Sequence, residues 1–217
     1  MIDNIVFDLD GTLIDTIEDL KNSVNFALSE NGFPPKTGEE VRLCVGNGIR
    51  QLVYDCLPDG VDEKIKEKCF EDFKGYYSKH SMDNTFAYDG IKEVLKEISQ
   101  SGYKISVVTN KIQPEAEKII RAFFGDIFDV IIGQKDGMPQ KPAPDGVLKA
   151  IEQMGCKKEN SVYIGDSQVD CLTAHNAGLP IIGVTWGFRS RQVLREYNAE
   201  IIIDKPEEIL GILDVRC

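Results

Sequence analysis

Short apolar runs rich in β-branched residues recur along the chain, and segments of helical length separate them. The runs that we predict as strands are Asn4–Asp8, Lys104–Thr109, Phe128–Gly133, Ser161–Asp166, Pro180–Thr185 and Glu200–Ile203. Helix-spaced patterns lie near 90–101, 112–124, 144–155, 168–177 and 189–197. Strands that alternate with helices in this way are typical of a parallel sheet with crossover helices on both faces. The pattern therefore predicts an α/β fold with a Rossmann-like core.

The stretch 16–82 breaks this alternation, because it contains no convincing strand and its apolar residues follow a helical spacing. We therefore predict a helical insertion over 16–82, and a core made of 1–15 and 83–217. The insertion leaves the core after the first strand and returns before the second. Ligands of open α/β sheets bind at the carboxyl ends of the strands, so we expect the insertion to act as a cap over an active site there.

Composition and charge narrow the class of protein. The chain is 42% hydrophobic without a long apolar run, which argues against a membrane span. A net charge of −11 without a basic stripe argues against a nucleic-acid partner. The N-terminus lacks the pattern of a secretory signal, so we expect a cytoplasmic protein. The six cysteines have no metal-type spacing and are expected to be reduced thiols; they are Cys44, Cys56, Cys69, Cys156, Cys171 and Cys217.

Two carboxylates, Asp8 and Asp10, stand where the first predicted strand leaves the sheet, and Gly11 after them permits a tight turn. A carboxylate can attack phosphorus if its charge repulsion with the phosphate is offset, and a second carboxyl group can protonate the leaving oxygen. The same motif also suits an Asx turn that closes a strand. Alone, it does not decide between these readings.

Two later segments offer groups that can hold a phosphate. Thr109 and Asn110 end the second predicted strand and present a hydroxyl and an amide, although this pair is also common at the start of a helix. Lys141 precedes Pro142, which biases it toward an extended conformation, and its ammonium can neutralise phosphate charge. A solvated loop lysine is the alternative.

Two more carboxylates, Asp166 and Asp170, follow the fourth predicted strand. Together with Asp8 and Asp10 they would repel one another strongly, which indicates a bound cation. Oxygen ligands near a substrate phosphate favour Mg²⁺. Zinc is disfavoured, because neither His80 nor His175 has a partner at metal-ligand spacing.

In this order and at these strand ends, the four segments resemble the motifs of the haloacid dehalogenase-like superfamily, over about the whole chain. The matching residues are Asp8, Asp10, Gly11, Thr12, Thr109, Asn110, Lys141, Pro142, Gly165, Asp166 and Asp170. The acid at position 10 is found in its phosphatases and phosphomutases and is absent from its dehalogenases.

The resemblance implies a role for each matching residue. Asp8 is the nucleophile and Asp10 the general acid and then base, while Thr109 and Lys141 hold the phosphate. Asp8, the Asp10 carbonyl and Asp166 ligate Mg²⁺, with Asp170 in support. Gly11, Thr12 and Asn110 are expected to contact the substrate.

The position of the insertion resembles that of the phosphoglycolate phosphatase and β-phosphoglucomutase group. Three segments favour the phosphoglycolate phosphatase-like members: Cys44–Arg50, Thr109–Lys111 and Trp186–Arg189. Arg50 is our candidate for reading a substrate carboxylate, with a solvated helix residue as the alternative. One departure from the relatives is Asp89, where they usually carry proline, and it bears on closure of the cap.

We therefore expect a Mg²⁺-dependent phosphatase that hydrolyses a small phosphate ester such as 2-phosphoglycolate through an aspartyl-phosphate, as a monomer or homodimer. The nearest alternatives are an inorganic pyrophosphatase and a β-phosphoglucomutase-like sugar phosphomutase. A catalytically silent binding module is a remote third, because the acidic and basic site residues are all retained.

Overall fold

The computed structural model describes residues 2–213, which form two compact units. The first unit contains the residues up to Ile14 and those from Ala87 onward, and the second is Asp15–Phe86. The chain passes from one unit to the other twice, through the short paired strands β2 (Ile14–Asp15) and β3 (Phe86–Ala87). The second unit is therefore an insertion in the sequence of the first.

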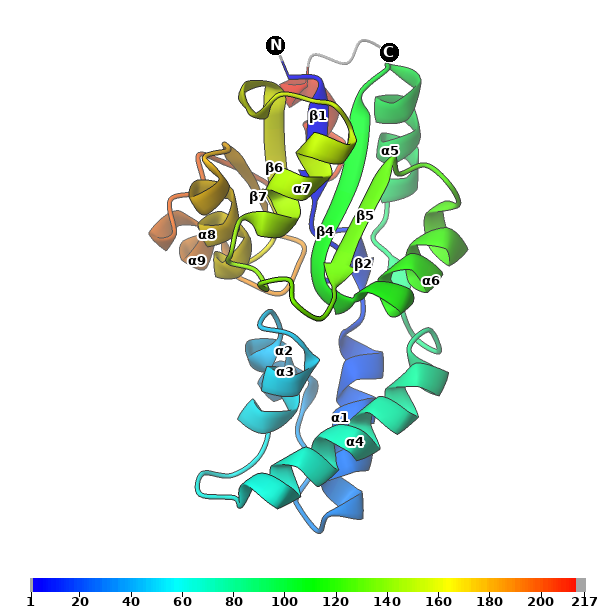
Figure 1. The fold of residues 1–217 in the computed structure, drawn as a ribbon, viewed down its shortest axis with the longest axis vertical. Helices are drawn as coiled ribbons and strands as arrows, with labels where there is room; N and C mark the ends of the chain where they lie inside the picture. The colour runs from blue at the N-terminus through cyan, green and yellow to red at the C-terminus, as the bar shows by residue number, and fades with distance from the viewer. Residues whose placement is uncertain (1, 214–217) are drawn as a thin grey trace. The chain divides into compact units, whose positions relative to one another are not determined.

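The first unit is built on a six-stranded sheet in the order β5-β4-β1-β6-β7-β8 (Figure 1). Its strands are β1 (Asn4–Phe7), β4 (Lys104–Ile112), β5 (Val130–Gln134), β6 (Ser161–Gly165), β7 (Ile181–Val184) and β8 (Ile201–Ile203). All neighbouring strands are parallel. The predicted α/β class with a parallel sheet is confirmed.

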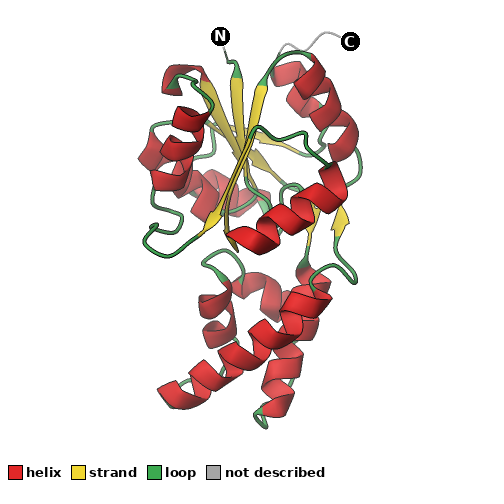
Figure 2. Cartoon of the chain, turned by 45° about the vertical axis from the view of Figure 1, so that its right-hand side comes forward, coloured by secondary structure: helices red, strands yellow, loops and turns green. Residues whose placement is uncertain are grey.

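Helices cover both faces of this sheet, as Figure 2 shows. They are α5 (Ile91–Gln100), α6 (Gln113–Phe124), α7 (Asp145–Gln153), α8 (Gln168–Ala177), α9 (Arg191–Glu196) and α10 (Glu208–Ile212), with a 3-10 turn at Lys158–Asn160. Successive side chains of a strand point to opposite faces, so Ile5 and Phe7 face away from Val6. Val6 packs in a buried cluster with residues of α7 and α8. All four residues of β1 are buried, which explains its uninterrupted apolar sequence.

The strand order places β1 at the point where the sheet changes direction. From β1 the chain continues to β4 and β5 on one side, and then returns to β6, β7 and β8 on the other. The carboxyl ends of β4, β1 and β6 therefore lie next to one another, and this is where open α/β sheets bind ligands. The topology brings together the segments that contain Asp8, Thr109 and Asp166.

Strand β4 is longer than predicted. The sequence pattern ends it at Thr109, whereas the structure continues it to Ile112, with a register shift between Val108 and Ile112. Asn110 and Lys111 are buried despite their polar side chains, because each has a hydrogen-bond partner, the Lys141 carbonyl and the Asp10 carboxylate respectively. The short elements β2, β3 and α10 were not predicted.

The second unit consists of four helices, α1 (Ile17–Glu30), α2 (Gly38–Cys44), α3 (Ile49–Asp55) and α4 (Glu63–His80). Their apolar faces share one core that includes Leu20, Val24 and Phe73. Buried Asp19 of α1 accepts hydrogen bonds from the backbone N–H groups of Asn84 and Thr85, which ties the start of the unit to its end. The predicted function of this unit as a cap stays a prediction.

Two further observations bear on the sequence predictions. Across residues 2–213, no helix combines the length and the apolar character needed to cross a membrane. Five cysteines are free thiols in this part of the chain, namely Cys44, Cys56, Cys69, Cys156 and Cys171. Cys217 lies outside the described residues.

Candidate active site

Lys141 joins two carboxylates at the carboxyl end of the sheet. Its Nζ lies 2.6 Å from Asp8 Oδ1 and 2.8 Å from Asp170 Oδ1. Asp8 directly follows β1, Asp170 lies in the first turn of α8, and Lys141 comes from the segment before α7. All three side chains are buried. The sequence prediction that these residues converge is therefore consistent with the fold.

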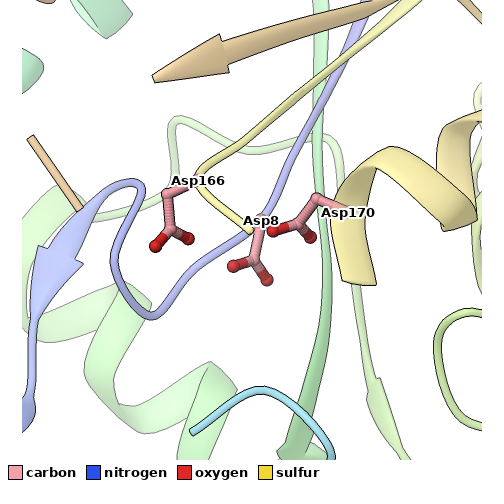
Figure 3. Close-up of side chains that lie close together, drawn as sticks. All are labelled: Asp8, Asp166 and Asp170. Carbon is pink, nitrogen blue, oxygen red and sulfur yellow. The ribbon is translucent and has the colours of Figure 1, made fainter. Parts of the chain in front are cut away.

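Asp166 is the third carboxylate of the site, and Figure 3 shows Asp8 between it and Asp170. The Phe188 N–H donates to Asp166 Oδ2 at 2.6 Å, and the Thr12 hydroxyl donates to Oδ1 at 3.3 Å. Gly11 is packed tightly here: its φ is +93°, and a Cβ on it would meet Asp166 Oδ2 at 2.5 Å. Glycine at position 11 is thus required both by the turn and by the carboxylate beside it.

Oxygen atoms of Asp8, Asp166 and Asp170 all lie within 4.8 Å of one another. Burial, with the neighbouring Asp170, raises the pKa of Asp8 well above its ordinary value, although Lys141 opposes this. Burial and Asp170 also raise the pKa of Asp166 to about 7, although the hydrogen bond from the Phe188 N–H lowers it. Burial disfavours the charged form of Lys141, but Asp170 and Asp8 outweigh it and raise the pKa of the ammonium well above its usual range. One lysine does not balance three carboxylates, so the donor set fits a divalent cation bound by oxygen.

Asp10 is not one of these three carboxylates, and it forms an ion pair with a different lysine. Lys111 Nζ is 2.8 Å from Asp10 Oδ1, and the exposed fractions of the two side chains are 3% and 15%. The atom of Asp10 that the sequence prediction assigns to the metal is the backbone carbonyl oxygen. The same prediction leaves the Asp10 carboxylate for proton transfer.

Thr109 and Asn110 contact the protein's own backbone. The Thr109 hydroxyl oxygen accepts a hydrogen bond from the Lys111 N–H at 3.1 Å. Asn110 Oδ1 accepts from the Lys141 N–H at 2.8 Å, and its Nδ2 donates to the Lys141 carbonyl at 3.1 Å. Asn110 therefore fixes the backbone of Lys141, and its predicted contact with the substrate stays a prediction.

The match to known proteins decides the family. The model of the haloacid dehalogenase-like hydrolase family matches residues 5–184, a range that includes Asp8, Lys141 and Asp166. The chain belongs to the haloacid dehalogenase-like hydrolase family. The resemblance inferred from its sequence motifs is confirmed.

Individual relatives of the haloacid dehalogenase-like chain match almost all of it. A phosphoglycolate phosphatase of Pseudomonas syringae pv. tomato is 34% identical over 97% of this chain and 80% of its own length. A phosphoglycolate phosphatase of Haemophilus influenzae is 30% identical over 96% and 97%. The crystal structure of a Lactobacillus delbrueckii subsp. bulgaricus protein has a TM-score of 0.93 and 30% identity, and it covers 97% of this chain and 98% of that one.

Two residues that contact the site of this haloacid dehalogenase-like protein were not predicted from its sequence. The Tyr163 hydroxyl accepts from Lys141 Nζ at 3.1 Å and donates to Asp170 Oδ1 at 3.1 Å. Burial raises the pKa of Tyr163 well above its usual value, so the phenol keeps its proton. An apolar strand context gives no signal for such a role. Lys111, which contacts Asp10, is the other residue. In the sequence it is simply a polar residue after a predicted strand.

Asp170 has a second function in the haloacid dehalogenase-like core, because it caps helix α8. Its Oδ2 accepts from the N–H of Ser167 at 3.0 Å and from the Ser167 hydroxyl at 2.6 Å. The Ser167 hydroxyl in turn accepts from the Asp170 N–H at 3.4 Å, which completes a capping box. The spacing of Ser167 and Asp170 is a sequence signal for this cap.

Arg50 belongs to the second unit of this haloacid dehalogenase-like chain. It lies on α3, donates to the Tyr54 hydroxyl at 3.3 Å and forms an ion pair with Glu67. Its guanidinium stacks 4.1 Å above the Phe70 ring, and 53% of the side chain is exposed. Within its unit, Arg50 is therefore held at the surface by three neighbours.

Proposed function

We propose that this phosphatase of the haloacid dehalogenase-like family hydrolyses a small phosphomonoester through an aspartyl-phosphate on Asp8. The observation that carries the proposal is the contact of 2.6 Å between Asp8 and Lys141, buried at the carboxyl end of β1. A buried lysine offsets the repulsion between an attacking carboxylate and a phosphate. The acid at position 10 supports a phosphatase rather than a dehalogenase.

The reaction has two steps. In the first, an oxygen of Asp8 forms a bond to phosphorus, the bond from phosphorus to the ester oxygen breaks, and Asp10 gives its proton to that oxygen. In the second, water attacks the phosphorus, Asp10 takes up the water proton, and the bond to Asp8 breaks. Thr109 and Lys141 hold the phosphoryl oxygens during both steps.

The residues that would hold Mg²⁺ are Asp8, Asp166 and the backbone carbonyl of Asp10. Asp170 supports them from its contacts with Lys141 and Ser167. When bound, Mg²⁺ neutralises charge on the phosphoryl oxygens. The fit rests on the crowding of buried carboxylates, because burial, and after it repulsion from Asp170, raises the pKa of Asp8 and of Asp166.

For the substrate we propose 2-phosphoglycolate or another small anionic phosphate ester. The support is the similarity to two phosphoglycolate phosphatases over nearly the whole chain. The second unit, as a cap, would provide contacts to the part of the substrate remote from phosphorus, because the core residues are already assigned to phosphate and metal. A cytoplasmic location and a monomeric or homodimeric state remain predictions.

Phosphate release from a panel of esters tests this function. With Mg²⁺ present, we expect release from 2-phosphoglycolate to exceed that from sugar phosphates and from pyrophosphate. A phosphomutase would instead need a bisphosphate activator and release little free phosphate. A preference for pyrophosphate, or turnover that depends on a bisphosphate, would replace the proposed function by one of its alternatives.

Arg50 allows a test of substrate recognition by the second unit. Arg50→Ala is expected to lower kcat/KM for a carboxylate-bearing ester by about tenfold or more, the loss of one charge-assisted contact. An uncharged aryl phosphate is expected to be nearly unaffected. The physical reason is that the planar guanidinium pairs with both oxygens of a carboxylate.

Glu67 offers a matched control for the Arg50 measurement, because it already pairs with this guanidinium. Glu67→Gln removes the competing carboxylate and should lower KM for the carboxylate-bearing ester alone. Equal losses on both esters with Arg50→Ala would assign Arg50 to folding or movement of the second unit. No loss on either ester would make it a surface residue.

A further inference from the structure

Lys111 is a buried cation that the proposed chemistry leaves without a function. Its side chain is 3% exposed, and its ammonium contacts Asp10 Oδ1 at 2.8 Å. Lysine is almost never buried without a partner, because removing an ammonium group from water is costly. The partner here is the carboxylate to which the proposed function assigns proton transfer. The Lys111 ammonium is therefore in direct contact with the carboxyl group that is proposed to react.

Both residues of this pair belong to the first unit and lie at the ends of neighbouring strands. Asp10 follows β1 and forms an isolated bridge with Ile14, and the Gly11 N–H donates to the Ile14 carbonyl at 2.8 Å. Lys111 lies within β4, in the part of the strand beyond the predicted end, and its N–H is bonded to the Thr109 hydroxyl oxygen. Lys111 thus projects from the irregular part of β4, between the paired residues Val108 and Ile112, whereas Asp10 lies outside the main sheet.

The carboxyl group of an aspartate can rotate about two side-chain bonds, and proton transfer needs it at hydrogen-bond distance from the leaving oxygen. Lys111 restrains this rotation by donating to Oδ1, which leaves the other carboxyl oxygen of Asp10 to carry the proton that is transferred. Because 15% of the Asp10 side chain is exposed against 3% of the lysine, the buried end of the pair is the lysine. Lys111 therefore acts as the fixed point and Asp10 as the group that is held.

We propose that Lys111 is a positioning residue that orients Asp10 toward the oxygen of the leaving group. The inference rests on the proposed function of Asp10. In the step concerned, Asp8 bonds to phosphorus, the ester oxygen leaves, and the proton passes from Asp10 to that oxygen. Lys111 itself transfers no proton and gains or loses no bond.

The leaving group separates this function from a direct contact of Lys111 with the phosphate. An alkoxide leaves poorly and needs a proton, whereas 4-nitrophenolate leaves well without one. A lysine that acts through Asp10 therefore matters for alkyl esters alone. A lysine that binds the phosphate, or that only stabilises the fold, matters for both esters alike.

The experiment measures kcat/KM, which reports the reaction up to transfer of the phosphoryl group, for an alkyl phosphate and for 4-nitrophenyl phosphate. Lys111→Met, which keeps length but removes charge, is expected to lower the alkyl value at least about tenfold, a part of the roughly hundredfold or more that general acid catalysis contributes. The 4-nitrophenyl value should change by less than about threefold. Lys111→Arg should restore part of the alkyl activity.

Asp10→Asn serves as the reference for loss of the acid itself. It should show the same dependence on the leaving group, and adding Lys111→Met to Asp10→Asn should cause little further loss, because the two residues act as one unit. The double variant also removes both charges of the buried pair, which guards against misfolding of the single variant.

Equal losses on both esters with Lys111→Met, or additive losses in the double variant, would overturn the inference. In that case the dependence on the leaving group in Asp10→Asn alone would still support the proposed function. If Asp10→Asn also affected both esters equally, the proposed function of Asp10 itself would fail.

Discussion

Replacing Asp8 with asparagine is expected to remove nearly all turnover and to leave the fold intact. The amide keeps the shape of the side chain and can still accept a hydrogen bond from Lys141, but it cannot attack phosphorus. The fold should not lose stability without metal, because burial and the carboxylate of Asp170 already disfavour the charged form of Asp8 and raise its pKa. Phosphate release and thermal unfolding of the metal-free protein measure the two effects.

Asp59→Asn is a suitable control, since it makes the same chemical change on an exposed loop of the second unit. It should match the parent chain in both measurements. Retention of more than about a tenth of the activity by Asp8→Asn, a barrier difference of about 1.4 kcal/mol, would exclude an aspartyl-phosphate at this position.

Removal of divalent cations with a chelator is expected to abolish activity, and Mg²⁺ is expected to restore it. Excess Ca²⁺ should inhibit, because its larger and more flexible coordination would misplace Asp8 relative to phosphorus. Asp166→Ala removes one of the crowded carboxylates and should raise the Mg²⁺ concentration needed for activity. Asp136→Ala, on an exposed loop of the same unit, provides the matched control.

The pH dependence of Mg²⁺ binding gives a measurement that does not rely on turnover. Burial and Asp170 raise the pKa of Asp166 to about 7, so below that pH the carboxyl group holds a proton that Mg²⁺ must displace. Displacing one proton weakens binding by about tenfold for each pH unit below this value. Calorimetric titration should show the trend and also proton release. Full activity in excess chelator, or Mg²⁺ affinity independent of pH in this range, would contradict the assignment.

The sequence predicts best those elements in which several consecutive residues are buried, because such elements appear as apolar runs. Strand β1 is buried throughout and reads as an apolar run, and the polar residues directly after it stand out. Topology then brings Asp8, Lys141 and Asp166 to one edge of the sheet. The strands β2 and β3, with two residues each, are too short to form a pattern.

The contacts that the sequence did not predict depend on partners far along the chain. Lys111 reads as a residue at the end of a strand, and its burial becomes evident from Asp10, which is 101 residues away. In the sequence, Tyr163 is one of several strand residues. The contacts of its hydroxyl with Lys141 and Asp170 form only through tertiary packing. Propensity and periodicity describe neighbours in sequence, so partners of this kind lie beyond them.

The central place of β1 in the sheet has a consequence for how the chain is made. Its neighbour β6 is distant in sequence: the hydrogen-bonded side chains of Asn4 and Ser161 are 157 residues apart. At a synthesis rate of about 5–20 residues per second, β1 is made roughly eight to thirty seconds before that partner. The helical second unit is complete at Phe86 and forms from contacts much closer in sequence. A nascent chain that stops before β6 therefore carries a complete helical unit and an apolar first strand with one edge unpaired, the kind of edge through which incomplete chains aggregate.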